Sequence, residues 1–211
     1  MHNSIKKYED ICNLIKLKLE GQKITKFPII IAVSKTFGIE KILPLIEYGH
    51  LDYGENKVQE AIDKWTKIDR SNIKLHLIGK LQTNKVKFAI KIFDFIHSVD
   101  SKKLAKKIAD EQLKLNKKLR IFIQVSIGDE EQKSGVNKNH LINLYRYCKE
   151  LNLDVIGLMC IPPAEEDSEK YFNQMNLLNK ELNLTELSMG MSSDYLKAAE
   201  HSSSYLRIGS S

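Results

Sequence analysis

A single lysine follows the most strongly apolar stretch of the chain. Residues 29–34 read Ile-Ile-Ile-Ala-Val-Ser, and Lys35 comes directly after them. Such a run is typical of a strand that is buried on both faces, as in a parallel sheet. Ligands of α/β folds bind at the carboxyl ends of such strands, where a partly desolvated lysine amine can form a Schiff base with a carbonyl compound. A lysine that merely extends from a strand end into solvent is the alternative interpretation of Lys35.

Glycine and serine residues follow the last two apolar runs. They occur in Met189-Gly190-Met191-Ser192 and in Gly209-Ser210-Ser211, and Ser192, Ser193 and Asp194 are expected to cap the next helix. Small residues let backbone N–H groups approach a phosphate, although ordinary turns have the same composition. A lysine amine together with a phosphate site points to a phosphorylated aldehyde, and pyridoxal 5′-phosphate is the commonest cofactor held in this way.

Strand and helix patterns alternate along the whole chain, without a long linker. Helical patterns cover residues 3–19, 38–48, 56–65, a stretch after 85, 102–115, 138–151, 165–182 and 194–200. The first ends before Gly21, and Asp100 and Ser101 are expected to cap the fifth. Strand patterns cover residues 29–34, 51–53, 75–78, 95–99, 121–126, 155–160, 186–189 and 205–208.

This alternation predicts an α/β fold with one domain, residues 1–211. Eight short strands separated by helices favour a closed (β/α)8 TIM barrel, with an extra N-terminal helix, over an open doubly wound sheet. A Rossmann-like sheet is the second choice, because no G-x-G-x-x-G motif follows the first strand. In a parallel barrel all strands end at one rim, so we expect the polar residues that close the strands to converge there: Lys35, Gly54-Glu55-Asn56, Ser126, residues 189–192 and residues 209–211.

Composition and charge exclude several function classes. The chain has 211 residues, 42% of them hydrophobic and 28% charged, and its 33 basic residues are interspersed with 27 acidic ones for a net charge of +6. Nucleic-acid binding is therefore not expected. Four of the basic residues are arginines, so an arginine is more informative here than a lysine: Arg70, Arg120, Arg146 and Arg207.

The cysteines and the N-terminus indicate where the protein works. Cys12, Cys148 and Cys160 have neither the pairing of a disulfide framework nor the spacing of a metal site. No apolar signal segment is present, and no run approaches the roughly 20 apolar residues that span a bilayer. We expect a cytoplasmic monomer that binds no metal, membrane or nucleic acid.

The chain resembles, from end to end, the YggS/PROSC family of pyridoxal-phosphate-binding homeostasis proteins, whose fold is related to the N-terminal barrel domain of alanine racemase. The motifs occur in the family's order, and any one of them alone would be weak. They are Ala32-Val33-Ser34-Lys35-Thr36, Tyr53-Gly54-Glu55-Asn56 with Val58-Gln59-Glu60, His76-Leu77-Ile78-Gly79 with Leu81-Gln82 and Asn84-Lys85, His97-Ser98-Val99-Asp100, Lys133-Ser134-Gly135-Val136, Gly157-Leu158-Met159, Leu187-Ser188-Met189-Gly190-Met191-Ser192 and Arg207-Ile208-Gly209-Ser210.

The resemblance implies that pyridoxal 5′-phosphate is bound as a Schiff base on Lys35. Asn56 would lie beside the cofactor, and Arg207 would face the pyridine nitrogen. The residues that the resemblance assigns to the phosphate, three directly and two through their backbone, are Ser192, Gly209 and Ser210, and Met189 and Gly190.

Arg207 is informative about reactivity. A guanidinium can only donate hydrogen bonds, so a pyridine nitrogen facing Arg207 must stay unprotonated. The ring is then a weaker electron sink than a pyridinium, which favours storage of the cofactor over broad catalysis.

Some positions depart from the family pattern. Tyr53 stands where the family commonly has Phe, and Ser210 where it has Thr, and both changes keep the required chemistry. Family members usually continue through an Ile-Phe-Gly segment after this point, so we expect a truncated or short C-terminal tail.

Two function classes remain open. The first is a protein of intracellular pyridoxal phosphate homeostasis, without catalytic residues, that passes the cofactor to client enzymes. The alternative is a racemase or decarboxylase of the alanine racemase fold, but those enzymes add a large β domain for which one barrel of 211 residues leaves no room.

An aldolase-like enzyme that acts on a sugar phosphate through Lys35 is a third, weaker candidate. It would need an acid and a base that the chain does not clearly supply. His76 and His97 lie on predicted strands and are expected to be hydrogen-bonded core histidines.

Overall fold

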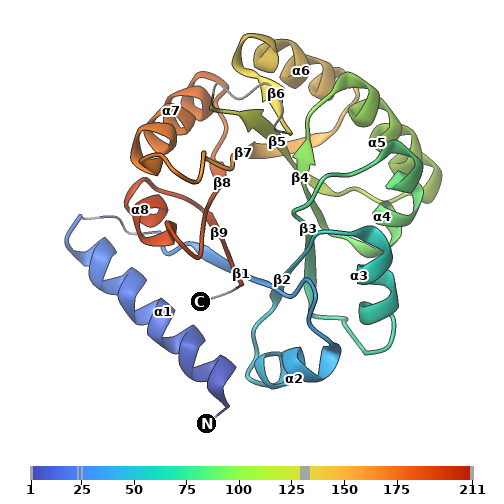
Figure 1. Ribbon diagram of the computed structural model, residues 1–211. Helices are drawn as coiled ribbons and strands as arrows, with labels where there is room; N and C mark the ends of the chain where they lie inside the picture. Colours follow the sequence, from blue (N-terminus) through green and yellow to red (C-terminus); the bar gives the residue numbers. More distant parts are fainter. Residues whose placement is uncertain (1, 23, 25, 129–133, 210–211) are drawn as a thin grey trace.

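The computed structural model describes residues 2–22, 24, 26–128 and 134–209 of the chain. Within them, eight parallel strands form a closed barrel that helices surround, as the sequence predicted (Figure 1). β1 pairs with β9 and β4 with β5, so the ring has no free edge. In order around the ring, the strands are β1 (Ile29–Val33), β2 (Asp52–Glu55), β3 (Lys74–Leu77), β4 (Phe95–Val99), β5 (Arg120–Ser126), β7 (Asp154–Met159), β8 (Glu186–Met191) and β9 (Tyr205–Ile208).

Helices connect successive strands on the outside of the ring (Figure 1). None of the described helices is both long enough and apolar enough to cross a membrane. The helical elements are α1 (Asn3–Glu20), α2 (Ile39–Glu47), α3 (Val58–Trp65), the 3-10 turn η1 (Thr83–Lys85), α4 (Val86–Ile92), α5 (Lys102–Leu115), α6 (Lys138–Glu150), α7 (Ser168–Glu181) and α8 (Tyr195–Glu200).

Most predicted elements are confirmed, with shifts at their ends. Ser101 caps α5, and its side chain accepts a hydrogen bond from the N–H of Leu104. The helix expected from residue 165 begins at Ser168, after Asp167. The short strand β6 (Val136–Asn137), which pairs with the end of β5 outside the ring, was not predicted, because two residues are too short for a recognisable pattern.

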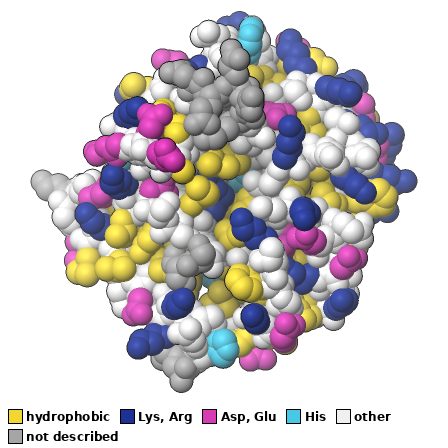
Figure 2. Space-filling model, in the orientation of Figure 1, with side chains coloured by type: hydrophobic (Ala, Val, Ile, Leu, Met, Phe, Trp, Pro, Cys, Tyr) yellow, Lys and Arg dark blue, Asp and Glu magenta, His cyan; other side chains and the backbone are white. Residues whose placement is uncertain are grey.

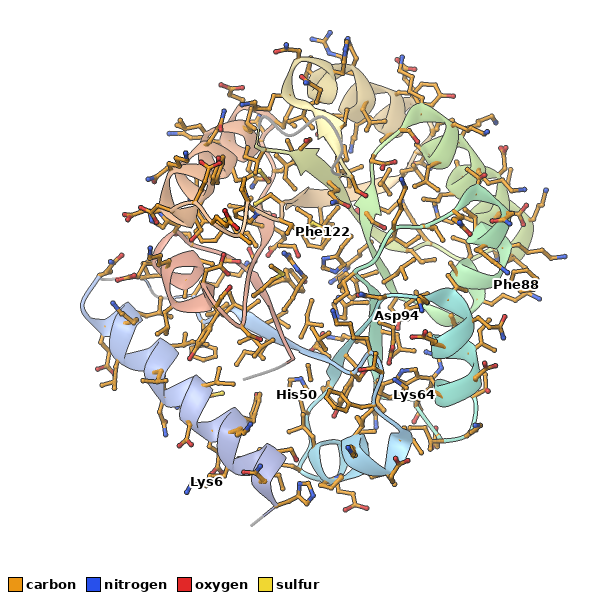
Figure 3. The ribbon with its side chains drawn as sticks, in the orientation of Figure 1. Lys6, His50, Lys64, Phe88, Asp94 and Phe122 are labelled. Carbon is orange, nitrogen blue, oxygen red and sulfur yellow. The ribbon has the colours of Figure 1, made fainter. Side chains whose placement is uncertain are left out.

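The core has two parts. The larger part lies between the strands and the helices, with Trp65 and Phe172 among its fully buried side chains. The smaller part fills the barrel itself, and its apolar members are Ile31, Phe95, Phe122, Met159 and Tyr205. In Figure 3, Phe122 lies inside the ring of strands, whereas Phe88 lies at the outer surface.

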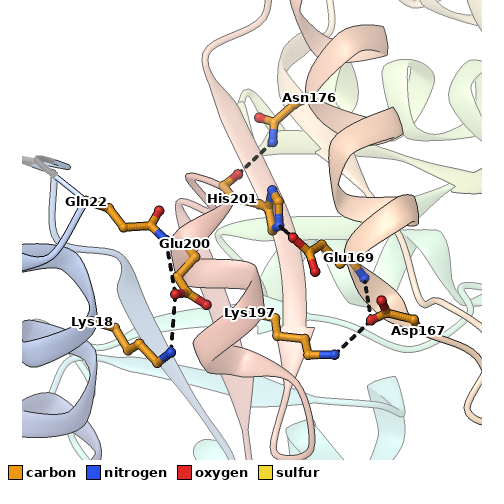
Figure 4. A network of polar contacts seen from close by, with 8 residues as sticks. All are labelled: Lys18, Gln22, Asp167, Glu169, Asn176, Lys197, Glu200 and His201. Atoms are coloured by element: carbon orange, nitrogen blue, oxygen red, sulfur yellow. Dashed lines mark hydrogen bonds and ion pairs between the residues drawn. The ribbon is translucent and has the colours of Figure 1, made fainter.

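The N-terminal helix α1 completes the helical layer between α8 and α2 (Figure 1). It buries Ile11, Ile15 and Leu19 against the barrel. Figure 4 shows how its end is tied to α8: Lys18 and Gln22 both donate to Glu200, at 3.3 and 3.0 Å. The extra N-terminal helix is therefore an integral part of the domain.

Candidate functional site

A cavity of about 660 Å³ opens at the carboxyl ends of the barrel strands. Its volume lies in the range of small-molecule sites. In Figure 2, which has the orientation of Figure 1, Lys and Arg side chains lie near the middle of the face shown, among apolar ones. The polar residues that line the cavity are Lys35, Thr36, Asn56, Lys80, Gln124, Ser134, Ser192, Ser193 and Arg207, and Gly79 and Gly209 line it with their backbone.

The cavity brings together five of the predicted site residues: Lys35, Asn56, Ser192, Arg207 and Gly209. Ser210 lies outside the described residues. Met189 and Gly190 do not line the cavity, because the Met189 side chain is fully buried in the core and Gly190 lies close to Ala198 of α8. Met191 lines it in their place.

Lys35 is exposed, but the backbone that leads to it is fixed. Ser34 is buried, its N–H donates to the carbonyl of Gly54 at 3.0 Å, and its hydroxyl donates to Glu55 at 2.7 Å. After Lys35 the chain turns sharply at Thr36, which has a positive φ of 66°. The lysine side chain thus extends into the cavity mouth from a rigid strand end.

Glu55 and Lys64 form the buried ion pair behind this strand end. Their Oε1 and Nζ atoms are 2.7 Å apart, and the side chains are 0% and 10% exposed. Lys64 also donates to the carbonyl of Ser34 at 2.6 Å, and the indole N–H of Trp65 donates to Glu55 at 2.9 Å. Lys64 is labelled in Figure 3, on α3. The pair therefore ties α3 to the end of β1.

The expectation that Glu55 belongs to the polar rim is wrong. β2 continues to Glu55, two residues beyond the predicted strand, so this side chain packs against α3 and not in the cavity. Of the 33 basic residues, four are arginines and 29 are lysines, and nothing in the sequence singles out Lys64 as the partner of Glu55.

Arg207 is 4% exposed and projects from β9. Its Nη1 donates to the hydroxyl of Ser188 at 2.7 Å, and its Nη2 donates to the carbonyl of Cys160 at 2.8 Å. Burial lowers the pKa of the Arg207 guanidinium from its ordinary value. No carboxylate among the described residues forms an ion pair with it, although the charge of Asp194 acts on it at longer range, so its two direct partners are neutral acceptors.

Gly209 and Ser192 lie together at the other side of the cavity. The N–H of Gly209 donates to the hydroxyl of Ser192 at 3.2 Å, and a Cβ atom at Gly209 would lie 3.0 Å from Cβ of Val33. The predicted helix cap is corrected here: Asp194 is the residue before α8, but its carboxylate accepts from the N–H of Met191 and makes no cap hydrogen bond. The turn after β8 needs that carboxylate to close.

His76 and His97 are fully buried and hydrogen-bonded, as predicted. Neither lines the cavity. Burial lowers the pKa of His76 and lowers that of His97 further below its ordinary range, so both rings are neutral. Within the described part of the chain, no group of three or more His, Cys, Asp or Glu side chains could hold a metal ion.

The cavity has the electrostatics of an anion site. Among the described residues that line it, Lys35, Lys80 and Arg207 are cationic and none is acidic. Lys80, Gln124 and Ser134 were not predicted. Gln124 donates to the carbonyl of Ser134 at 3.1 Å, a contact between β5 and the following loop that local sequence patterns do not encode.

Comparison with known proteins places this site in context. The family model of the alanine racemase N-terminal domain matches residues 19–211. Pyridoxal phosphate homeostasis proteins of Aquifex aeolicus and Pasteurella multocida are 40% and 36% identical to this chain over 190 and 193 residues, in each case 85% of this chain and 83% of the relative. The protein of the same name from Escherichia coli K12 is 33% identical over 192 residues, 85% of this chain and 82% of the relative.

Solved structures give a consistent result. PipY of Synechococcus elongatus PCC7942, determined with and without PLP, superposes with a TM-score of 0.83 at 32% identity, over 92% of this chain and 97% of PipY. An alanine racemase of Clostridium difficile 630 superposes with a TM-score of 0.69 at 16% identity, over 94% of this chain and 56% of the racemase. The second likeness is one of fold alone.

The buried ion pair yields a stability prediction. Glu55→Gln leaves the ammonium group of Lys64 without its counter-ion, and we expect the free energy of unfolding to fall by about 2–3 kcal/mol, somewhat less than for a fully buried pair. Glu60→Gln is the matched control, because its pair with Lys57 has side chains 74% and 40% exposed. That change should cost less than about 0.5 kcal/mol. Urea unfolding measures both, and equal effects would contradict the assignment.

The neutral histidines yield a pH prediction. In the unfolded chain they bind protons below a pH of about 6.5, whereas in the folded protein burial lowers both pKa values, so stability falls as the pH falls through the unfolded value. His97→Phe should reduce the slope of the free energy of unfolding against pH by up to about 1.4 kcal/mol per pH unit, whatever its effect on stability at neutral pH.

The control for this measurement is His140→Phe, since His140 is exposed. It should leave the slope of the wild type unchanged. A wild-type stability that does not fall between neutral pH and a pH of about 5 would show that the buried histidines are not held neutral.

Proposed function

Because the chain belongs to the YggS/PROSC family of pyridoxal phosphate homeostasis proteins and has the alanine racemase N-terminal fold, we propose that it binds pyridoxal 5′-phosphate in the rim cavity. It would hold the cofactor for transfer to client enzymes, without a dedicated reaction of its own. The observation that carries the proposal is one cavity lined by both Lys35 and Arg207 and, among the described residues, by no carboxylate.

The residues present fit this cofactor. An amine at a strand end suits its aldehyde, and a cationic cavity suits its phosphate dianion. At Gly79, a Cβ atom would overlap the carbonyl oxygen of Asn56, and at Gly209 it would press on Val33, so both glycines keep backbone close to the cavity. Room for an anion between backbone N–H groups is what a phosphate site requires.

The proposed roles follow from position. Lys35 would bind the aldehyde carbon covalently through Nζ, and Ser192 and Gly209, with Ser210 outside the described residues, would bind the phosphate. Asn56 would lie beside the ring. Met189 and Gly190 would act on the phosphate site through the backbone that leads to Met191 and Ser192. Arg207 would donate to the ring nitrogen.

Arg207 also decides how reactive the bound cofactor is. When bound, pyridoxal phosphate supplies a ring that accepts an electron pair from a bond broken on an attached amino acid, and it does so best when its nitrogen is protonated. Arg207 has only donors to offer and therefore opposes that protonation. A protein built in this way holds the cofactor while activating it weakly.

A racemase or decarboxylase is the second candidate, because enzymes share the fold. The alanine racemase mentioned above and an arginine decarboxylase of Paramecium bursaria Chlorella virus, with a TM-score of 0.66 at 14% identity, are examples. Such chemistry needs a proton donor or acceptor beside the substrate. Among the described lining residues there is no His, Asp, Glu, Tyr or Cys, so Lys80 alone could act beside Lys35. This favours binding over catalysis.

Two further parts of the proposal concern the cell. The three cysteines are unpaired, and burial raises the pKa of Cys148 and Cys160 to about 12, which supports a reducing compartment such as the cytoplasm. A monomer whose cavity mouth is open would give client enzymes access to the cofactor, and size-exclusion chromatography tests that state.

The covalent role of Lys35 is tested with borohydride. Wild-type protein incubated with pyridoxal phosphate and then reduced should carry one pyridoxyl group on Lys35, found by intact mass and peptide mapping. Lys35→Ala should lose this label completely, while Lys80→Ala should keep it. A label of full occupancy at another residue in Lys35→Ala would show that Lys35 does not hold the aldehyde.

The absence of a dedicated reaction is tested by turnover. Purified protein loaded with cofactor should racemise or decarboxylate none of a panel of amino acids at a rate near 1 per second, roughly the lower end of ordinary enzymatic values. Sustained turnover at that rate would establish the enzyme alternative. Loss of such turnover in Lys80→Ala would identify its base.

A further inference from the structure

A continuous line of hydrogen bonds crosses the interior of the barrel and ends at Arg207. Nη1 of Arg207 lies 2.7 Å from Oγ of Ser188, which lies 2.8 Å from Nδ1 of His97. Nε2 of His97 lies 3.0 Å from Nδ1 of His76, whose Nε2 lies 3.0 Å from Oδ1 of Asp52. The line begins on β2 and passes through β3, β4 and β8 to β9.

The chemistry of its two ends fixes the direction of every bond. Arg207 can only donate, so Ser188 accepts from it and has one hydrogen left to donate. That hydrogen goes to Nδ1 of His97, because Ser188 Oγ has no third partner among the described residues. His97 then carries its proton on Nε2 and donates to His76, and His76 donates in the same way to the carboxylate of Asp52.

The surroundings hold the two rings in this arrangement. The His76 ring stacks on Phe95 with 4.2 Å between centroids, and the His97 ring stacks on Phe122 at 4.3 Å. Both histidines are 0% exposed, so water does not compete for their nitrogens. Bonds that all point from a cation to an anion polarise one another, and this strengthens each of them.

We infer that Ser188, His97, His76 and Asp52 form a one-directional hydrogen-bond chain that positions Arg207 as a fixed donor toward the cavity. Both histidines are neutral and carry their proton on Nε2. The two neutral rings cannot point the other way, because the unprotonated Nε2 of His76 would then face the carboxylate of Asp52, and the hydroxyl hydrogen of Ser188 would be left without an acceptor. The chain therefore delivers no proton toward the cavity, and it keeps the group that faces Arg207 an acceptor.

The inference rests on the proposed function only in naming that group as the ring nitrogen of pyridoxal phosphate. Ser188 and the histidines are positioning residues, since they act on the ligand through Arg207. Positioning Arg207 therefore explains why the barrel interior contains these polar side chains, which packing alone would not need.

The first test needs neither a variant nor a ligand. Long-range proton–nitrogen NMR of isotope-labelled histidine in the ligand-free protein should show His76 and His97 neutral, each with its proton on Nε2. A proton on Nδ1 of either ring would overturn the inference.

The second test compares two matched variants. Ser188→Ala removes the link between Arg207 and His97, whereas Ser98→Ala removes a hydroxyl that is equally buried, on β4, and has no hydrogen-bond partner among the described residues. Ser188→Ala should shift the His97 ring signals and weaken pyridoxal phosphate binding about tenfold, and Ser98→Ala should do neither. If Ser188→Ala matched Ser98→Ala in either measurement, the inference would be wrong.

The two proposals fail in different ways. If the wild-type protein bound no pyridoxal phosphate, the proposed function would be wrong, while the histidine spectra of the ligand-free protein would still decide the direction of the chain. If the cofactor bound but the tautomers differed from those expected, the proposed function would stand and the one-directional hydrogen-bond chain would be refuted.

Discussion

The pairing of β1 with β9 is the contact on which the site depends. Ile31 lies opposite Arg207 and Ala32 opposite Ile208, in a parallel register. Because parallel strands end on the same side, this pairing sets Gly209 against Val33 and brings Lys35 to the same cavity as Gly209 and Arg207, although the strands stand at opposite ends of the sequence. Closing so long a loop has an entropic cost that local contacts do not repay. The whole ring and its helical layer, α1 included, must therefore form before the cavity exists.

Sequence patterns were sufficient for the ring and for part of its rim. The alternation of strand and helix patterns located the eight strands, and the rule that parallel strands end at one rim placed Lys35, Asn56, Ser192 and Gly209 together. The rarity of arginine in this chain drew attention to Arg207. The strands and the rim depend on local composition and topology, whereas the place of Arg207 in the site came from the family resemblance.

The parts that sequence did not reveal depend on which faces meet across the structure. The sequence pattern ended the strand at Tyr53, so Glu55 was expected at the rim. In the structure β2 continues through Glu55, and the side chain is buried against α3. The link from Asp52 to Ser188 joins four strands, and only the inward orientation of these side chains creates it. His76 and His97 were correctly expected to be hydrogen-bonded, but no spacing in the sequence names their partners.

Two buried cations illustrate how differently a charge can be compensated. Lys64 meets a carboxylate at 2.7 Å, so its charge is neutralised within the wall of the barrel. Arg207 meets a hydroxyl and a carbonyl, and its nearest anion along the hydrogen-bond chain is Asp52, beyond two neutral rings. Asp194 acts on the guanidinium only at longer range, without an ion pair, so the charge of Arg207 remains available to a ligand lone pair or anion in the cavity.

This arrangement suits a holder better than a catalyst. A carboxylate in the place of Arg207 would stabilise a proton on the ring nitrogen of a bound pyridoxal phosphate, and the ring would then withdraw electrons more strongly. The chain of neutral donors has the opposite effect, since each member must keep its proton for the bond that it already makes. Lys35, by contrast, lies exposed at the mouth, where water and the amines of other proteins can reach it. Reversible storage of an aldehyde requires that the protein activate the bound cofactor only weakly and that the lysine that holds it remain accessible from solvent.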